Sequence, residues 1–279
     1  MTAVPENPNT SVVQAIEANL YSFGITQFGK WPRIDVYDEP HLLWFECDMP
    51  SPMFNVAHRA RLSRENVAEA IKTVKERYAR RDLSFVWWVD PSSTPLALSK
   101  HLTAAGFMPA GEMTGMAVDL AQNIDPEKAS EKQAPADLEI RPTTDEDSLA
   151  VFAHTMCAGY EMKAATKGPM VELSLAMGYG TEGPLINYVG YADGHAVATS
   201  SLFVDGDTAG IYNVATVPGF RHRGFGTKIT LAPLREAARR GCKLAVLHAS
   251  AMAVPMYRRI GFDSYCYFHL YIWPSEPQQ

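Results

Sequence analysis

The chain has 279 residues, a length that suits two domains of ordinary size, each able to bury its own core. Hydrophobic residues make up 47% and charged residues 20%, a composition typical of soluble globular proteins that excludes a fibrous or disordered chain. The net charge is -6 and the basic residues are scattered, which excludes a broad binding surface for nucleic acid or an acidic membrane.

No apolar run approaches the length of a membrane span, and the first residues lack the basic and apolar regions of a signal peptide. The four cysteines, Cys47, Cys157, Cys242 and Cys266, are far apart and form no metal-ligand spacing with the eight histidines. We therefore expect free thiols, no metal and a cytoplasmic location, while the oligomeric state stays open.

In the first half of the chain, residues 84–90 (SFVWWVD) predict a buried strand that contains Trp87 and Trp88. Residues 94–107 then predict a helix followed by Gly-Phe. Residues 121–137 are polar and lack a hydrophobic period, which is typical of a linker. This places one domain at residues 1–120 and a second at residues 138–279.

The second domain predicts the order β, α, α, β, β, β, α, β, α, β. Its first helix should be capped by Thr144 or Asp145, because both side chains can accept a hydrogen bond from the first turn. The ten elements fall, in order, at residues 138–142, 145–160, 169–179, three strands within 186–217, 224–240, 243–249, 251–260 and 265–273.

Short matches at a nearly constant offset indicate an internal duplication. Residues 54–57 (FNVA) match residues 212–215 (YNVA), and the Ala-Arg-Arg of residues 79–81 recurs at 238–240. Gly-Phe occurs at 106–107 and again at 261–262. The first half therefore repeats the later part of the second.

The most informative segment is residues 212–227, YNVATVPGFRHRGFGT, in which a strand passes through Arg-His-Arg into a Gly-x-Gly that opens a helix. Helix N-terminal amides have no internal partner and lie at the positive end of the helix dipole, so they bind phosphate oxygens. Arg221, His222 and Arg223 add positive charge there, which suits a pyrophosphate.

Two other phosphate loops are excluded by spacing. No glycine stands at the third position after Gly226, as the dinucleotide-binding fingerprint requires. A Walker A loop needs Lys after its second glycine, whereas Phe225 follows Gly224.

The segment resembles the CoA-pyrophosphate loop of the GNAT superfamily of N-acetyltransferases, and residues 248–262 resemble the next motif of that family in the correct order. The resemblance implies an α/β (α+β) fold with two GNAT-like domains, each a central, mostly antiparallel mixed sheet flanked by helices. It also implies acetyl-CoA as co-substrate. The implied cofactor-binding residues are Val214, Ala215, Thr216, Arg221, His222, Arg223, Gly224, Phe225, Gly226 and Thr227.

Tyr257 stands where the family keeps a tyrosine that protonates the departing CoA thiolate. The general base is open, because the strand at residues 208–217 contains no carboxylate. His248 is one candidate, and a water chain is another. In the first domain Leu102 corresponds to Tyr257 and residues 58–66 lack glycine, so we expect that domain to be a degenerate copy without CoA.

The expected function is transfer of acetyl from acetyl-CoA to an amine of a small molecule or peptide, by direct attack in a ternary complex. One alternative is a catalytically inactive CoA-binding or regulatory protein. A second is an unrelated phosphate or nucleotide module. The acceptor and the acyl-chain preference are not fixed by these motifs.

Overall fold

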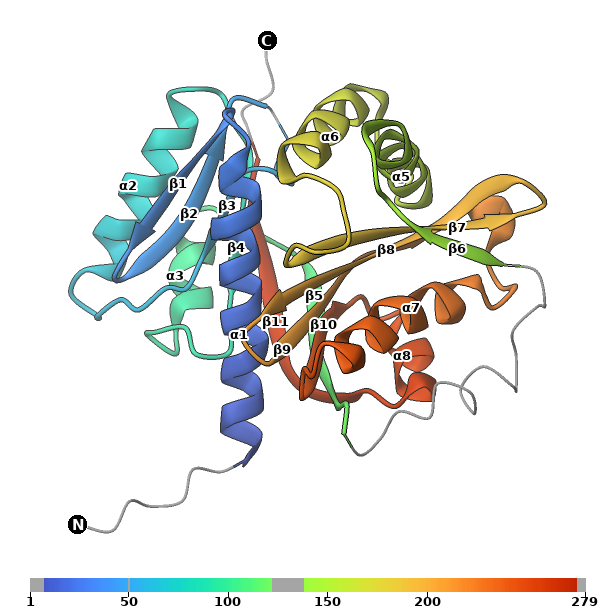
Figure 1. Ribbon diagram of the computed structural model, residues 1–279. Coiled ribbons are helices and arrows are strands. Elements are labelled where there is room, and N and C mark those ends of the chain that lie inside the picture. Colours follow the sequence, from blue (N-terminus) through green and yellow to red (C-terminus); the bar gives the residue numbers. More distant parts are fainter. Residues whose placement is uncertain (1–7, 50, 122–137, 275–279) are drawn as a thin grey trace. The chain divides into compact units, whose positions relative to one another are not determined.

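The computed structural model describes residues 8–49, 51–121 and 138–274 (Figure 1). The predicted linker lies outside these residues, apart from residue 121. Two compact units are present: unit 1 comprises Met1–Phe23 and Gly115–Tyr265, and unit 2 comprises Gly24–Thr114 and Cys266–Gln279. Each unit therefore contains two stretches of chain. The division of the sequence into domains at residues 1–120 and 138–279 stays a prediction.

Unit 1 follows the predicted order of elements from residue 139 onward. Three elements, α1, β5 and β11, have residues in both units. The elements with residues in unit 1 are α1 (Pro8–Gln27), β5 (Met108–Asp119), β6 (Glu139–Pro142), α5 (Glu146–Gly159), α6 (Ala164–Met177), β7 (Leu185–Ala192), β8 (His195–Asp205), β9 (Thr208–Thr216), α7 (Phe225–Arg239), β10 (Leu244–Ala249), α8 (Val254–Ile260) and β11 (Asp263–Trp273).

The strands of unit 1 lie in the order β5-β10-β9-β8-β7-β6. Neighbours from β6 to β9 are antiparallel, whereas β10 is parallel to β9. Helices α5 and α6 cover one face of this sheet, and α7 and α8 cover the other (Figure 1). The expected mixed, mostly antiparallel sheet flanked by helices is confirmed.

The start of α5 shows why its sequence forms a helix there. The Asp145 carboxylate accepts a hydrogen bond from the Ser148 N–H at 2.8 Å, and the Ser148 hydroxyl accepts one from the Asp145 N–H at 3.2 Å. This reciprocal capping box assigns the cap to Asp145 and not to Thr144. Helix α6 begins at Ala164, five residues before the predicted start, and Pro169 lies inside it.

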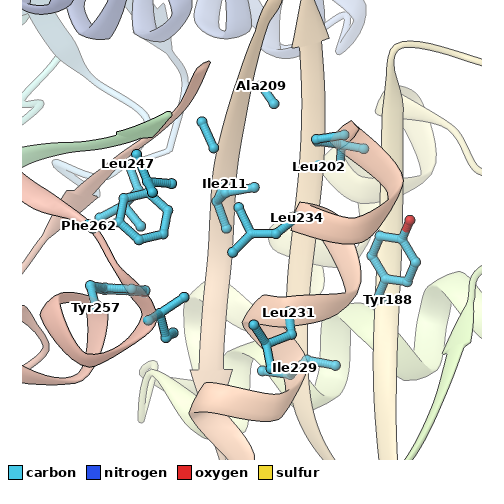
Figure 2. Close-up of a cluster of buried hydrophobic side chains, with 14 of the residues drawn as sticks. Tyr188, Leu202, Ala209, Ile211, Ile229, Leu231, Leu234, Leu247, Tyr257 and Phe262 are labelled. Carbon is cyan, nitrogen blue, oxygen red and sulfur yellow. The ribbon is translucent and has the colours of Figure 1, made fainter. Parts of the chain in front are cut away.

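The core of unit 1 on the α7 side is built from alternate residues of the strands and the apolar stripe of α7 (Figure 2). Burial of each large aliphatic or aromatic side chain contributes about 1.5–3 kcal/mol relative to exposure. Members of this cluster include Tyr188, Leu202, Ile211, Leu234, Leu247 and Phe262.

Unit 2 contains β1 (Ile34–Glu39), β2 (Leu42–Cys47), β3 (Val56–His58), β4 (Phe85–Val89), α2 (Val67–Ala79) and α3 (Leu98–Ala104). Its core includes Trp87, which is fully buried as predicted. Strands β1, β2 and β3 are antiparallel neighbours, and β3 is parallel to β4. Helix α3 begins at Leu98, four residues after the predicted start.

Candidate active site

Strands β9 and β10 separate partway along their length. They pair in parallel at Thr208–Leu244, Ala209–Ala245 and Gly210–Val246, and no pair follows in the described chain. Further along β9, Asn213 has a φ of 53°, and the register with β8 shifts there. This bulge turns β9 away, and the edge of β9 that carries residues 214–216 opens into a gap between the two strands.

The loop that follows β9 has the geometry of an anion site. His222 and Gly224 have φ values of 61° and 79°, so left-handed residues flank Arg223. The N–H groups of residues 222–227 donate no hydrogen bond within the described chain, and Gly224 is the N-cap of α7. Six amides next to the positive end of a helix dipole form a cradle for phosphate oxygens.

The two arginines of this loop have different roles. Arg221 donates to the carbonyl oxygens of Gly159 and Thr216 at 2.7 and 3.2 Å and forms an ion pair with Glu161 at 2.9 Å. It therefore fastens the end of α5 to the end of β9. The exposed Arg223 guanidinium lies 4.9 Å from the centre of the Phe225 ring, which holds its charge beside the amides.

Three glycines near this loop have different structural roles. Gly224 supplies the left-handed backbone conformation. A Cβ on Gly226 would lie 2.9 Å from the Met256 sulfur, so this glycine permits close packing of α7 against α8. Likewise, a Cβ on Gly159 would lie 2.7 Å from the Ala215 Cβ, so α5 approaches β9 closely only because residue 159 is glycine.

Tyr257 comes from α8 and is 6% exposed. Its ring packs edge-on against Phe262 at 5.8 Å in the cluster of Figure 2. Burial raises the pKa of Tyr257 well above its usual value, and the neighbouring Tyr160 phenol raises it further. The hydroxyl therefore stays protonated at neutral pH, and within the described chain it makes no hydrogen bond that a leaving group would have to displace.

Two residues near the gap were missed by sequence reasoning. The Tyr160 hydroxyl, at the end of α5, donates to the Val214 carbonyl oxygen at 3.3 Å. Asn213 forms the bulge itself. Neither position carries a catalytic motif: Tyr160 is the last residue of the predicted helix and the C-cap of the observed α5, and a left-handed asparagine looks like any strand residue in the sequence.

His248 lies on β10, on the face opposite to Leu247. Leu247 and its alternate neighbours Ala245 and Ala249 belong to the core beneath α7 and α8. Both ring nitrogens of His248 are buried. His248 and Tyr257 are thus associated with opposite faces of β10.

In unit 2, hydrogen bonds join the segments that follow β3 and β4. After β3, the Thr94 N–H donates to the Ala60 carbonyl at 2.9 Å, and the Leu62 N–H donates to the Thr94 carbonyl at 3.2 Å. A bridge joins Arg61 and Thr94. Leu102, the counterpart of Tyr257, is fully buried core. Beyond the two pairs of β3 and β4, Val56–Val86 and Ala57–Trp87, the segments that follow these strands are thus joined again at Arg61 and Thr94.

Comparisons with known proteins place the fold. Residues 161–262 match the model of the acetyltransferase (GNAT) family. A GCN5-related N-acetyltransferase from Kribbella flavida has 18% identity and a TM-score of 0.68, covering 93% of this chain and 96% of its own. One from Sphaerobacter thermophilus has 13% identity and a TM-score of 0.63, covering 99% and 98%. No curated protein matches.

A tandem GNAT protein from the clavulanic acid biosynthesis pathway has 14% identity and a TM-score of 0.59, covering 98% of this chain and 97% of its own. These likenesses show the fold over nearly the whole chain. The matched family model and the fold support an acyl-CoA-dependent N-acyltransferase at the level of the family. The family match covers residues 161–262, and the GNAT assignment applies to that part of the chain.

Within the residues that the structure describes, no helix has the length and apolarity that a membrane span requires. No group of three or more His, Cys, Asp or Glu side chains is placed to hold a metal ion in the same residues.

Proposed function

We propose that the protein transfers an acetyl group from acetyl-CoA to an amine, by direct attack in a ternary complex. The observation that carries the proposal is the gap between β9 and β10 followed at once by six unbonded amides at residues 222–227. In CoA a pantetheine arm is followed by a pyrophosphate. The arm would lie in the gap and the pyrophosphate would bind the amides, so the two features follow each other in the same order as the two groups of CoA.

In this proposal the main chain of Val214, Ala215 and Thr216 binds the pantetheine arm, and residues 222–227 bind the pyrophosphate. Tyr257 protonates the CoA thiolate as the carbon–sulfur bond breaks. Burial keeps this phenol protonated when the thiolate forms, so a proton is present to be donated, although the raised pKa also makes Tyr257 a weaker acid than an exposed tyrosine.

His248 and a water chain are the two candidates for the general base. His248 lies on the α5 side of β10, where an acceptor would approach, and it would act on the amine directly or through water. Replacement by Gln keeps the size and hydrogen-bonding capacity of the side chain. If His248 is the base, His248→Gln removes the acidic limb of the kcat/KM profile that the histidine would cause; an unchanged profile leaves water in that role.

Unit 2 is proposed to be a degenerate structural copy that binds no CoA, because Leu102 stands in place of Tyr257 and a bridge at Arg61 and Thr94 joins the segments that follow β3 and β4. The reaction is assigned to the cytoplasm, a compartment that suits the four free thiols. Nucleic acid and membranes are not proposed as partners.

Release of CoA thiol from acetyl-CoA in the presence of a panel of amines, peptides and aminoglycosides tests this function. Amine-dependent thiol release supports the acetyltransferase. Saturable acetyl-CoA binding without any turnover supports the alternative, a catalytically inactive CoA-binding protein. Binding of ADP or NAD that equals the binding of CoA supports a nucleotide module.

A further inference from the structure

The bulge in β9 adds one residue at the place where β9 leaves β10. Asn213 and Val214 together stand opposite Ser200 of β8, so β9 contains one residue more than β8 there. The last parallel pair of β9 and β10 in the described chain is Gly210–Val246, just before the bulge. Because a bulge bends the strand that contains it, loss of the extra residue would let β9 continue beside β10 and close the gap.

Asn213 takes a conformation that a strand residue does not ordinarily adopt. Its φ of 53° lies in the left-handed region, which is unfavourable for a residue with a Cβ, although asparagine tolerates it better than most. The extended conformation is the ordinary alternative in a strand, and it would remove the bulge. Neighbouring groups must therefore stabilise the left-handed form if the gap is to stay open.

Two buried hydroxyl groups of β8 bind Asn213, one at its side chain and one at its backbone. The Asn213 Nδ2 donates to the Ser201 Oγ at 3.1 Å, and the Thr199 hydroxyl donates to the Asn213 carbonyl oxygen at 2.8 Å. Both Ser201 and Thr199 are 0% exposed. The Ser201 hydroxyl in turn donates to the Asn187 Oδ1 of β7 at 2.6 Å. A line of hydrogen bonds thus runs from β7 through β8 to the bulge.

The serine next to Ser201 has no part in this line. Ser200 is also 0% exposed, and its hydroxyl donates to the Ile229 carbonyl oxygen of α7 at 2.8 Å. Because successive side chains of a strand point to opposite faces, Ser200 lies on the α7 side of the sheet and Ser201 on the α5 side. The two serines have equal burial and one side-chain hydrogen bond donated each, but only Ser201 holds Asn213.

We propose, on the basis of the acetyltransferase function above, that Ser201 and Thr199 are positioning residues for acetyl-CoA. Their hydrogen bonds keep Asn213 left-handed, and the bulge keeps the β9 edge at residues 214–216 free for the pantetheine arm. When one of these bonds is lost, the extended form of Asn213 gains population and the fraction of molecules with an open gap falls. The apparent dissociation constant of acetyl-CoA then rises in inverse proportion to that fraction.

The test is calorimetric titration of the full-length protein with acetyl-CoA, comparing Ser201→Ala with Ser200→Ala as the matched control. Each variant loses one buried hydroxyl of β8, so the two should lose similar stability in urea unfolding. Loss of the hydrogen bond to Asn213 should raise Kd about tenfold in Ser201→Ala. In Ser200→Ala, Kd should stay within about twofold of the wild-type value, because Asn213 keeps both its bonds.

Asn213→Gly separates positioning from a general loss of structure. Glycine adopts the left-handed conformation without a side chain to hold it, so Asn213→Gly should keep the wild-type Kd within about threefold. Adding Ser201→Ala to Asn213→Gly should then change Kd by less than about twofold. If Ser201→Ala does not fold, Thr199→Val takes its place, because valine keeps the branched shape and removes only the hydroxyl; it should raise Kd at least about threefold.

A wild-type Kd in both Ser201→Ala and Thr199→Val overturns the inference. An equal rise in Ser200→Ala, or a rise that persists in full in the Asn213→Gly background, overturns it as well. In each of these cases acetyl-CoA still binds to the wild-type protein, so the proposed function stands. Absence of acetyl-CoA binding by the wild-type protein overturns the proposed function and this inference with it.

Discussion

Tyr257→Phe separates the chemical role of the phenol from its packing. The ring contributes to the core beside Phe262, and phenylalanine keeps that contact. Because the hydroxyl makes no hydrogen bond within the described chain, its removal should change the free energy of unfolding by no more than about 0.5 kcal/mol. Acetyl-CoA affinity should also stay nearly constant.

Turnover should fall, because the thiolate loses its proton donor. General acid catalysis contributes about 10²- to 10⁴-fold, and a thiolate is already a fair leaving group, so we expect kcat to fall about 10- to 100-fold. The assay is single-turnover thiol release, which reports the chemical step. Tyr179→Phe, at a tyrosine that is 48% exposed, is the matched control and should behave like wild type.

An unchanged single-turnover rate in Tyr257→Phe would refute the acid assignment, and a large loss of stability would show that the hydroxyl anchors α8 instead. The pH profile gives a second test. Because burial raises the pKa of Tyr257, the acid form should persist through pH 10, and activity should be lost only as the pH rises through the higher value. A loss of kcat between pH 8 and 9 that Tyr257→Phe abolishes would contradict this.

Three further predictions concern the loop, the packing of α5 and the end of α7. Gly224→Glu should abolish acetyl-CoA binding in calorimetry by straining a left-handed position and adding negative charge, whereas Gly219→Glu, where a side chain meets open space, should weaken it much less. Gly159→Ala should destabilise the fold by about 1–3 kcal/mol in urea unfolding, whereas Gly168→Ala, also in open space, should be neutral or stabilising. Hydrogen bonds from arginines lower the pKa of Glu236 to about 2 from 4.5, so its contribution to stability is present above pH 4.5 and is lost as the pH falls towards 2. Glu236→Gln should therefore lower stability at pH 7 by about 1–2 kcal/mol and flatten the acid limb of a stability curve.

The order of elements and the anion loop could be predicted from the sequence because local chemistry determines them. Alternation of apolar residues specifies the strands of unit 1, and Asp145 specifies a helix start through contacts only three residues away. Tyr257 was predicted as the acid from the resemblance to a motif of the GNAT family. The residue lies in the core on the α7 side, and its role stays a prediction.

Contacts between distant residues could not be predicted in this way. Asn19 lies 193 positions from Tyr212, yet its side chain accepts a hydrogen bond from the Tyr212 hydroxyl. Arg221 looks like a phosphate ligand in the sequence, whereas its guanidinium is used on Gly159 and Glu161. Asn213 takes a left-handed conformation that its residue type does not require, because the surrounding hydrogen bonds impose it.

The central claim is that the chain contains one working acetyl-CoA site, in unit 1, and none in unit 2. Calorimetric titration of the full-length protein with acetyl-CoA tests this claim directly through its stoichiometry. We expect one acetyl-CoA site per chain. Binding should be lost in Gly224→Glu, and CoA but not NAD should compete with acetyl-CoA for the site. Two sites per chain, or one site that survives Gly224→Glu in the folded protein, would contradict it.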